Sequence, residues 1–185
     1  MRQLVAITVL LLLSLGALPG CAIYNTAVDE RPVGTIVKDE TISAKLQAKF
    51  LEDKTVSYLN ISPLSYEGHV YLVGEYDTAK ERDRAIALAE ETDGVREVTT
   101  FLLPVKPGDT CGTTDNLEKK AAVKKRLIED KGIWSTNVNV EVVQCRVVLL
   151  GIVGSTAELD KAVAHAKAVP GVREVKSFLK VRARN

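Results

Sequence analysis

The sequence lacks the residue patterns on which most catalytic and metal-binding sites depend. It has only three cysteines and two histidines among 185 residues. No Cys/His cluster has metal-site spacing, and there is neither a glycine-rich phosphate loop nor a nucleophile elbow. His69 and His165 lie far apart without a partner pattern, which favours surface or packing roles. We therefore predict a protein that is not an enzyme, with no catalytic residue, metal, cofactor or small-molecule substrate.

The sequence also lacks a surplus of charge of either sign. Lysine and arginine together number 25, and aspartate and glutamate number 24. Cleavage before Cys21 would remove one basic residue, Arg2, and no acidic one, leaving the chain formally neutral. A neutral chain does not bind nucleic acid through its bulk charge, so we expect no nucleic-acid partner and only a local basic surface.

Long apolar runs are absent except at the N-terminus. There, the segment from Leu4 to Leu18 carries no charged residue and follows the positive Arg2. These fifteen residues are too few for a membrane-spanning helix, which needs roughly 20. The length fits the apolar region of a secretory signal.

The end of this run resembles a lipobox, the site where a bacterial lipoprotein is diacylated on cysteine and cleaved. It reads Leu18-Pro19-Gly20-Cys21, with proline where alanine or serine is usual. Ala22 follows instead of aspartate, which implies export to the outer membrane. We predict a signal peptide over residues 1–20, lipidation of Cys21, and a lipid-anchored protein on the periplasmic face of the outer membrane. The alternatives are an ordinary signal peptide with a fortuitous cysteine, or a retained anchor helix.

The rest of the sequence is a duplication with an offset of 77 residues. Gly94–Val98 returns as Gly171–Val175, and Glu52–Lys54 returns as Glu129–Lys131. The register holds without a gap across about 65 residues, which chance does not produce. Each copy is therefore one structural unit.

Each copy begins with a predicted helix, over residues 40–53 and 117–130. Asp39 and Asn116 stand where an N-cap belongs. The helical spacing assigns these residues to the core: Ile42, Leu46 and Phe50 in the first copy, and Leu117, Ala121, Leu127 and Ile128 in the second.

Two short strands are predicted after each of these helices. Residues 138–142 alternate valine with polar residues, as a strand with one buried face does. Residues 70–73 and 147–150 are continuous apolar runs, expected for a covered strand. Glu67 and Gly68 lie at the turn between the two strands of the first copy.

A second helix follows in each copy. Residues 78–81 and 155–158 both read as capping boxes, with a hydroxyl residue followed three positions later by glutamate. The helices are expected to run to Gly94 and Gly171, because glycine suits the left-handed residue that ends a helix. Each copy thus has the order α-β-β-α-β once its last strand is added.

The last strands, over residues 95–103 and 172–181, should lie parallel to the second strands because a right-handed crossover joins them. Pro63 places the first strand at a sheet edge, since proline removes a ladder donor. Gly74 and Gly151 are expected to end the second strands. We predict an α+β fold of two tandem domains, each a three-stranded mixed sheet with two helices on one face.

This order of elements, with the paired Gly-Val-x-x-Val closings and Val-x-Leu-x-Gly strands, resembles the BON domain. A lipobox followed by two such units resembles a dual BON-domain outer-membrane lipoprotein. The resemblance implies a non-enzymatic protein that binds anionic phospholipid through its second domain and supports envelope integrity. The predicted segments are an acylated cysteine and tether (21–38), BON domain 1 (39–106), a linker (107–115) and BON domain 2 (116–183).

The two first helices differ in charge in a way that supports lipid contact. Residues 39–54 carry a net charge of −1, and residues 116–131 carry +3. Each basic residue near an anionic bilayer contributes about 1 kcal/mol, and tryptophan suits the headgroup boundary. The predicted phospholipid-binding residues are Lys119, Lys120, Lys124, Lys125 and Trp134.

Two alternatives remain for this surface. The lysines could simply be solvated, and Trp134 could close the core. As we align it, the family's helix begins with apolar and aromatic residues where this chain has Lys119 and Lys120, so we expect electrostatic or Trp134-centred contact and not insertion at that point.

Cys111 in the linker and Cys145, which stands where the first copy has Gly68, could form a disulfide in an oxidising periplasm. The alternatives are two free thiols or a contact between chains. A bridge would connect the linker to the hairpin of the second domain.

An alternative function is a protein-interaction adaptor that docks an envelope assembly protein or a peptidoglycan-associated partner, with the lipid serving only to localise it. Small sheets with exposed edges suit that function too. A third possibility is a structural, stress-protective envelope protein without a defined ligand.

Overall fold

The computed structural model describes residues 31–183, so the predicted signal peptide and Cys21 lie outside the described residues. The first copy comprises α3 (Val33–Glu52), β1 (Ile61–Tyr66), β2 (His69–Tyr76), α4 (Ala79–Glu90) and β3 (Glu97–Pro104). The second comprises α5 (Thr113–Glu129), the short 3₁₀ helix η1 (Ser135–Asn137), β4 (Val138–Val143), β5 (Arg146–Val153), α6 (Thr156–Lys167) and β6 (Glu174–Val181). Within residues 31–183, no helix is both long and apolar enough to cross a bilayer.

Each copy contains one three-stranded mixed sheet, as predicted. The strand orders are β1-β2-β3 and β4-β5-β6. The first two strands of each sheet pair antiparallel, and the last strand pairs parallel with the second. Pro63 pairs with Leu72 on the edge strand β1, where its missing N–H costs no ladder bond.

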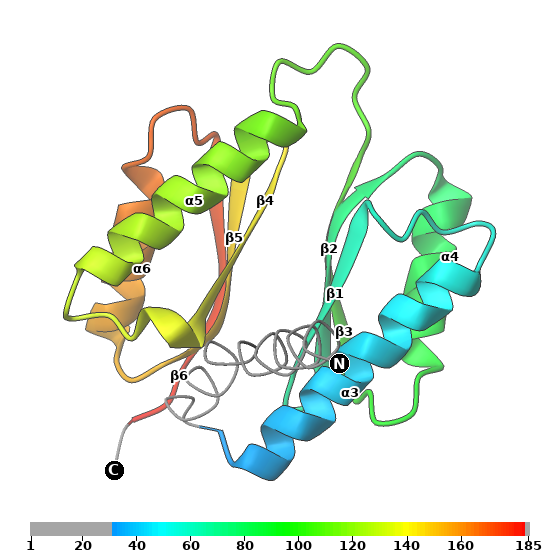
Figure 1. Ribbon diagram of the computed structural model, residues 1–185, viewed down its shortest axis with the longest axis horizontal. Helices are drawn as coiled ribbons and strands as arrows, with labels where there is room; N and C mark the ends of the chain where they lie inside the picture. Colours follow the sequence, from blue (N-terminus) through cyan, green and yellow to red (C-terminus); the bar gives the residue numbers. More distant parts are fainter. Residues whose placement is uncertain (1–30, 184–185) are drawn as a thin grey trace, which may run out of the picture.

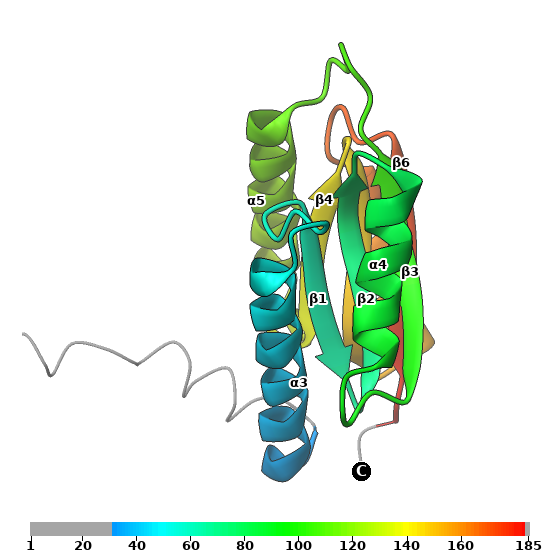
Figure 2. The same ribbon diagram turned by 90° about the vertical axis from the view of Figure 1, so that its right-hand side faces the viewer.

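The two helices of each copy cover one face of its sheet and form its core. In the first copy, α3 contributes Ile42, Leu46 and Phe50, which pack against Ala85, Leu88 and Ala89 of α4 and against Val70 and Leu72 of β2. Figure 1 shows α4 and α6 on the outer sides of the two sheets, and Figure 2 shows α3 and α5 in one layer beside them. The predicted fold class is confirmed.

The prediction of core residues was partly wrong for α5. Leu127 is buried as predicted, but Leu117, Ala121 and Ile128 are exposed, and the unpredicted Val123 is buried beside Leu127. These two occupy the positions of Leu46 and Phe50 in the first copy. The error arose because α5 carries two apolar stripes at helical spacing, and only one of them faces the sheet.

Asp39 and Asn116 are not N-caps, because both helices begin earlier than predicted. The caps are Pro32 and Gly112, and residues 33–38 are helical instead of forming part of a tether. Asp39 Oδ1 accepts the Gly68 N–H at 2.8 Å, and Asn116 Oδ1 accepts the Cys145 N–H at 2.9 Å. The side chain at this position therefore ties the first helix to the hairpin turn.

Each hairpin turn has two residues with positive φ, the pattern of a type I′ turn. In the first copy these are Glu67 (57°) and Gly68 (74°), and in the second Gln144 (48°) and Cys145 (57°). Glycine adopts this conformation without steric cost. Cys145 adopts it with a side chain, held by the bond from its N–H to Asn116.

The second helices begin as predicted but use their glutamates differently. The hydroxyls of Thr78 and Ser155 accept the N–H groups of Glu81 and Glu158. The buried carboxylate of Glu81 does not return to the cap residue. It accepts the N–H of Asp77 at 2.7 Å and that of Ser57 at 2.8 Å, and Glu158 repeats this pattern. Each glutamate thus holds the loop that follows the first helix.

The glycine predictions were partly wrong. α4 ends at Glu90 and α6 at Lys167, before the glycines predicted to end them, although Gly94 and Gly171 do have positive φ. Gly74 and Gly151 lie within β2 and β5 instead of ending them. A Cβ at either position would collide with the carbonyl of Asn60 or Asn137, so close backbone approach requires glycine there.

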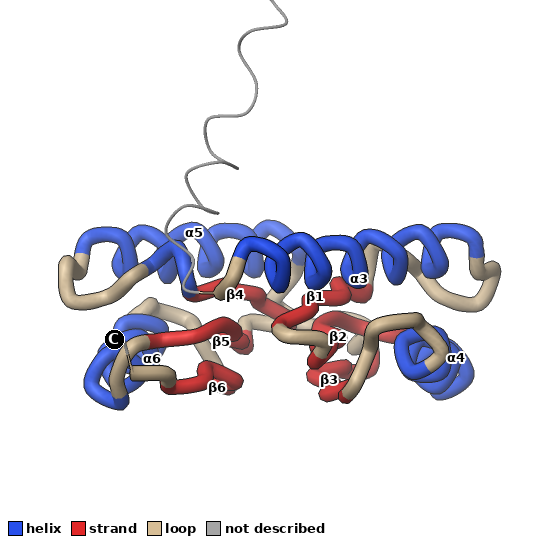
Figure 3. The backbone as a smooth tube through the Cα atoms, turned by 90° about the horizontal axis from the view of Figure 1, so that it is seen from below, coloured by secondary structure: helices blue, strands red, loops and turns tan. Residues whose placement is uncertain are grey.

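The uncovered faces of the two sheets pack against each other (Figure 3). The core between the two sheets contains Tyr71, Val73, Val143, Val148 and Leu150. The hairpin turns complete the contact reciprocally. Gln144 Nε2 donates to Glu75 Oε1 at 2.7 Å and to the Pro104 carbonyl at 2.8 Å, while Arg182 donates to Glu67 Oε1 at 2.7 Å. Burial between the domains supports two units that are small on their own.

Candidate functional site

Two of the predicted lipid-binding lysines are held by the second domain itself. Lys119 occupies the position of Ile42, and its Cε lies 3.1 Å from the point where a Gly171 Cβ would be. Its stem therefore covers Gly171 as Ile42 covers Gly94. Lys120 Nζ pairs with both carboxylate oxygens of Glu141, at 3.0 and 2.8 Å. Neither side chain is freely displayed.

The other two lysines lie on the exposed side of α5. Lys124 is exposed, and Lys125 makes only a 3.8 Å contact with Glu129. Leu117 (66 % exposed) and Ile128 (69 % exposed) share one face with Lys124 because they lie seven and four residues from it. We call Leu117, Ala121, Lys124, Lys125 and Ile128 the α5 face.

Trp134 is 44 % exposed, so it does not close the core; its neighbour Ile133 is buried in that place. Trp134 lies just beyond α5 and caps η1. Its backbone N–H donates to Glu158 Oε1 at 2.8 Å, which fixes the loop that carries it. Trp134 therefore follows the C-terminal end of the helix that carries the α5 face.

The corresponding face of α3 lacks the two lysines, although Val33 and Val37 in its first turns are also exposed. Glu40, Gln47 and Ala48 stand at the positions of Leu117, Lys124 and Lys125, whereas Ala44 and Leu51, the latter 62 % exposed, match Ala121 and Ile128. Both helices lie in the same layer on one side of the molecule (Figures 2 and 3). The two outer faces therefore offer a direct internal comparison.

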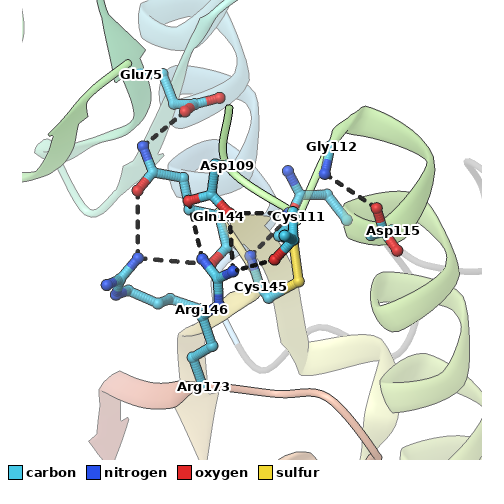
Figure 4. The surroundings of a disulfide bond; sticks show 11 residues. Glu75, Asp109, Cys111, Gly112, Asp115, Gln144, Cys145, Arg146 and Arg173 are labelled. Atoms are coloured by element: carbon cyan, nitrogen blue, oxygen red, sulfur yellow. Dashed lines mark hydrogen bonds and ion pairs between the residues drawn. A yellow bond between two sulfur atoms is a disulfide. The ribbon is translucent and has the colours of Figure 1, made fainter. Parts of the chain in front are cut away.

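The linker docks onto the second domain through a disulfide and an ion pair (Figure 4). Cys111 and Cys145 are joined, with their Cα atoms 5.8 Å apart. Arg173 forms a two-pronged pair with Asp109, at 2.9 Å from Nη1 to Oδ2 and 2.7 Å from Nη2 to Oδ1. The same guanidinium contacts Thr110 Oγ1 at 3.0 Å.

The electrostatics of this contact favour a charged carboxylate. The hydrogen bond from Arg173, together with the Cys111 N–H at 2.8 Å, lowers the pKa of Asp109 from 3.8 to about 2. The pKa of Arg173 is raised by the same pair. Sequence reasoning found the cysteines but missed Asp109 and Arg173.

The first domain has an open groove at the equivalent place. Its volume is about 780 Å³, and it lies between the first half of α3, the β1–β2 turn and the α4–β3 loop. Lining residues include Lys38, Ile42, Lys45, Gly68, Gly94 and Arg96. We call this the domain 1 groove. The repeat of Arg96 as Arg173 in the sequence was the signal that could have pointed to it.

Among residues 31–183, no group of three or more His, Cys, Asp or Glu side chains could hold a metal ion. His69 stacks on Tyr71 with ring centroids 4.2 Å apart, and His165 pairs with Asp130 at 2.8 Å. Packing thus explains His69, and ion pairing explains His165. The prediction of a non-enzymatic protein stays a prediction.

Two tandem αββαβ units whose sheets pack back to back place the chain in a class of small duplicated domains. The BON domain matches residues 38–103 and 116–183, so the chain belongs to the BON-domain family. This confirms the family resemblance seen in the sequence.

Similar proteins match the chain over most of their length. The chain is 30 % identical over 152 residues to osmotically-inducible protein Y of Escherichia coli, covering 81 % of this chain and 76 % of that protein. It is 27 % identical over 157 residues to outer membrane lipoprotein DolP of Haemophilus influenzae, covering 84 % and 81 %. A solved structure of the C-terminal domain of CdsD, a structural protein of the type III secretion system of Chlamydia trachomatis, matches with a TM-score of 0.32 at 17 % identity, covering 78 % of this chain and 67 % of that one.

Proposed function

We propose that this protein is an outer-membrane lipoprotein, anchored through Cys21 on the periplasmic side, whose second BON domain binds anionic phospholipid and supports envelope integrity. The observation that carries the proposal is the α5 face, where exposed leucine and isoleucine flank exposed lysines beside Trp134. The similarity to an outer membrane lipoprotein supports the compartment.

The composition of the α5 face suits a headgroup boundary better than it suits water. Leucine and isoleucine side chains gain about 25 cal/mol per Å² of apolar surface removed from water. Each nearby lysine adds about 1 kcal/mol of attraction to an anionic surface. The indole of Trp134 prefers the same depth. Contact therefore combines shallow insertion with electrostatics, which revises the expectation of a mainly electrostatic surface.

The anchor makes weak contact sufficient. Acyl chains on Cys21 would hold the domains within a short distance of the bilayer, and this raises the effective concentration of the α5 face at the lipid surface. Residues 22–32 precede α3, which lies in the same layer as α5 (Figure 3). A platform of two helices on one side of the molecule is thus available to a membrane.

The chain's single tryptophan allows a direct test. Residues 22–185 would be titrated with vesicles of phosphatidylglycerol and, separately, of phosphatidylcholine, while Trp134 fluorescence is followed and binding is checked by flotation. We expect a blue shift and flotation with the anionic vesicles only. Lys124→Glu/Lys125→Glu should weaken binding at least tenfold, because it replaces two attractions of about 1 kcal/mol each by repulsions.

A matched pair of variants tests the apolar part. Ile128→Ser on α5 should weaken binding about fivefold or more, because it removes apolar surface from the contact. Leu51→Ser, at the equivalent position of α3, should change binding less than twofold. Equal losses in both variants, or no binding by the unchanged chain, would rule out the α5 face as the lipid surface.

A further inference from the structure

We propose that the domain 1 groove binds an extended acidic segment of a partner protein, in the same pose that the chain's own linker takes on domain 2. This interaction surface goes beyond lipid binding and lies in the other domain. It rests on the repeat, which gives both domains the same groove, and on the described residues, which fill only the groove of domain 2.

Arg96 and Arg173 make equivalent hydrogen bonds in the walls of the two grooves. The Arg96 N–H donates to the Gly68 carbonyl and the Arg173 N–H to the Cys145 carbonyl, both at 2.8 Å. The guanidinium of Arg96 also donates to the carbonyl of Glu67, as that of Arg173 does to the carbonyl of Gln144. Each arginine is thus fixed against its hairpin turn by the same contacts.

In domain 2, the equivalent arginine, Arg173, pairs with a carboxylate from the linker. Residues 109–111 cross its groove, and Asp109 takes both guanidinium nitrogens. In the described part of domain 1, no carboxylate faces Arg96 in this way. Arg31, the first described residue, does not reach this position: it pairs with buried Asp39 at 2.7 Å and lies 4.8 Å from the Tyr66 ring centroid.

The charges around the domain 1 groove leave a basic surplus at its wall. Its three acidic residues already have partners: Asp39 pairs with Arg31, Glu67 with Arg182, and Asp93 with Lys45. Among the described residues, Lys38 and Arg96 form no ion pair with an acidic side chain, and both line the groove. A carboxylate that enters the groove would therefore meet two cations, and a two-pronged pair with arginine is among the stronger charge-assisted contacts.

The floor of the groove suits a peptide backbone. Gly68 and Gly94 lack side chains, so the Arg96 side chain lies against the first and Ile42 against the second. In domain 2 the position of Gly68 is Cys145, whose side chain bonds covalently to the crossing segment. The described part of domain 1 has no such cysteine, so its occupant would bind reversibly. A segment with Asp or Glu followed by small polar residues fits this description.

The chain itself supplies the probe. A peptide of residues 105–114 with Cys111→Ser would be added to ¹⁵N-labelled residues 22–185 without lipid, and amide shifts would be recorded. We expect shifts at Gly68, Gly94 and Arg96 and not at Cys145 and Arg173, whose groove is filled. The same peptide with Asp109→Asn should bind at least tenfold more weakly, as should the protein with Arg96→Glu, because a charge-assisted bond contributes about 1.5–3 kcal/mol.

Arg82→Glu, a charge change on α4 away from the groove lining, serves as the control and should leave peptide affinity unchanged. An unchanged spectrum elsewhere shows that Arg96→Glu remains folded. Absence of shifts in the groove, or equal binding of the peptides with and without the Asp109→Asn change, would overturn the proposal. So would weaker phosphatidylglycerol binding by Arg96→Glu, which would make the groove a phosphate site. The α5 variants test lipid binding separately, so the two proposals can fail independently.

Discussion

The two BON domains share one backbone plan, yet they differ at three equivalent places. Asp39 and Asn116 hold equivalent hairpin turns, one with a buried charge and one with a neutral amide. Within residues 31–183, the groove beside the turn is open in domain 1 and filled by the linker in domain 2. The outer face of the first helix carries Lys124 and Lys125 on α5 but Gln47 and Ala48 at the equivalent positions of α3.

This comparison separates what folding requires from what the two domains do. Positions that pack, such as Phe50 and Leu127, remain large and apolar because each seals a small core. Surface positions are free of that constraint, so differences there report on partners. Variants at equivalent positions therefore measure the divergence directly.

The largest difference is expected at the buried acid. Asp39→Ala would remove the carboxylate that pairs with buried Arg31 and accepts the N–H groups of Glu67 and Gly68. Loss of one partner of a buried ion pair costs about 3–5 kcal/mol. Asn116→Ala would leave mainly the Cys145 N–H without its acceptor, which should lower the free energy of unfolding by about 1–3 kcal/mol. Urea unfolding of each variant measures the free energies.

The Arg31→Met/Asp39→Asn double variant serves as the control. It keeps an acceptor for the hairpin turn and removes both charges, so it should recover most of the stability lost in Asp39→Ala. If Asp39→Ala unfolded at the same urea concentration as the unchanged chain, the buried pair would contribute nothing and the contrast between the domains would disappear.

The disulfide is the next largest difference. Cys111 and Cys145 are 34 residues apart, and closing a loop of that size stabilises the folded state by about 3–4 kcal/mol through the unfolded chain. Cys111→Ser/Cys145→Ser should lose this amount under oxidising conditions. Under reducing conditions the two proteins should unfold alike, since neither then has the cross-link.

A glycine variant sharpens this test. Cys111→Ser/Cys145→Gly restores at the second turn the residue that the first turn has. Because Cys145 has positive φ and a side chain in that region costs roughly 1 kcal/mol, this variant should be about 1 kcal/mol more stable than the double serine variant. A lower stability would mean that the turn does not favour glycine.

Most of the fold could be read from the sequence because the repeat and its turn signals are local. Pro63 marked an edge strand, and the Gly-Val-x-x-Val closings marked the return of the last strand. The N-caps could not be read correctly, because Asp39 and Asn116 bind hairpin turns 29 residues away. A polar residue near a helix start has the same local signature in either role.

The candidate site was less accessible to sequence reasoning. α5 has two apolar stripes, and only packing shows that Val123 and Leu127 face inward while Leu117 and Ile128 face outward. The partners that neutralise Lys120 and Arg173 are Glu141 and Asp109, and both are distant in sequence. Long-range pairing decides which charges remain available, and a single sequence does not record it.

The reciprocal hairpin contacts predict a smaller asymmetry at the domain interface. Gln144→Ala would leave Glu75 and the Pro104 carbonyl without a buried donor, at a cost of about 1–3 kcal/mol. Glu67→Ala removes only an exposed pair with Arg182, which contributes about 0–1 kcal/mol. Calorimetry should show a lower melting temperature chiefly for Gln144→Ala. Equal effects would mean that the two turns hold the interface equally.

The smallest expected effect is a pH dependence that His69 contributes and its equivalent in domain 2 does not. His69 and its equivalent Arg146 both face a glutamate, at 3.3 and 3.4 Å. Burial lowers the pKa of His69 from 6.5, against the attraction of Glu97 and assisted by the approach of Lys180 from domain 2. The unfolded chain therefore binds a proton first as the pH falls.

The consequence is that the stabilisation present above pH 6.5 is lost as the pH falls from 6.5 to the lowered pKa of His69. Urea unfolding should give a lower free energy at about pH 5.5 than at about pH 7.5. His69→Gln cannot titrate and should reduce this difference, whereas Arg146→Gln should lower stability equally at both pH values. If His69→Gln kept the full pH dependence, the titration would belong to another group and the histidine would be only a packing residue against Tyr71.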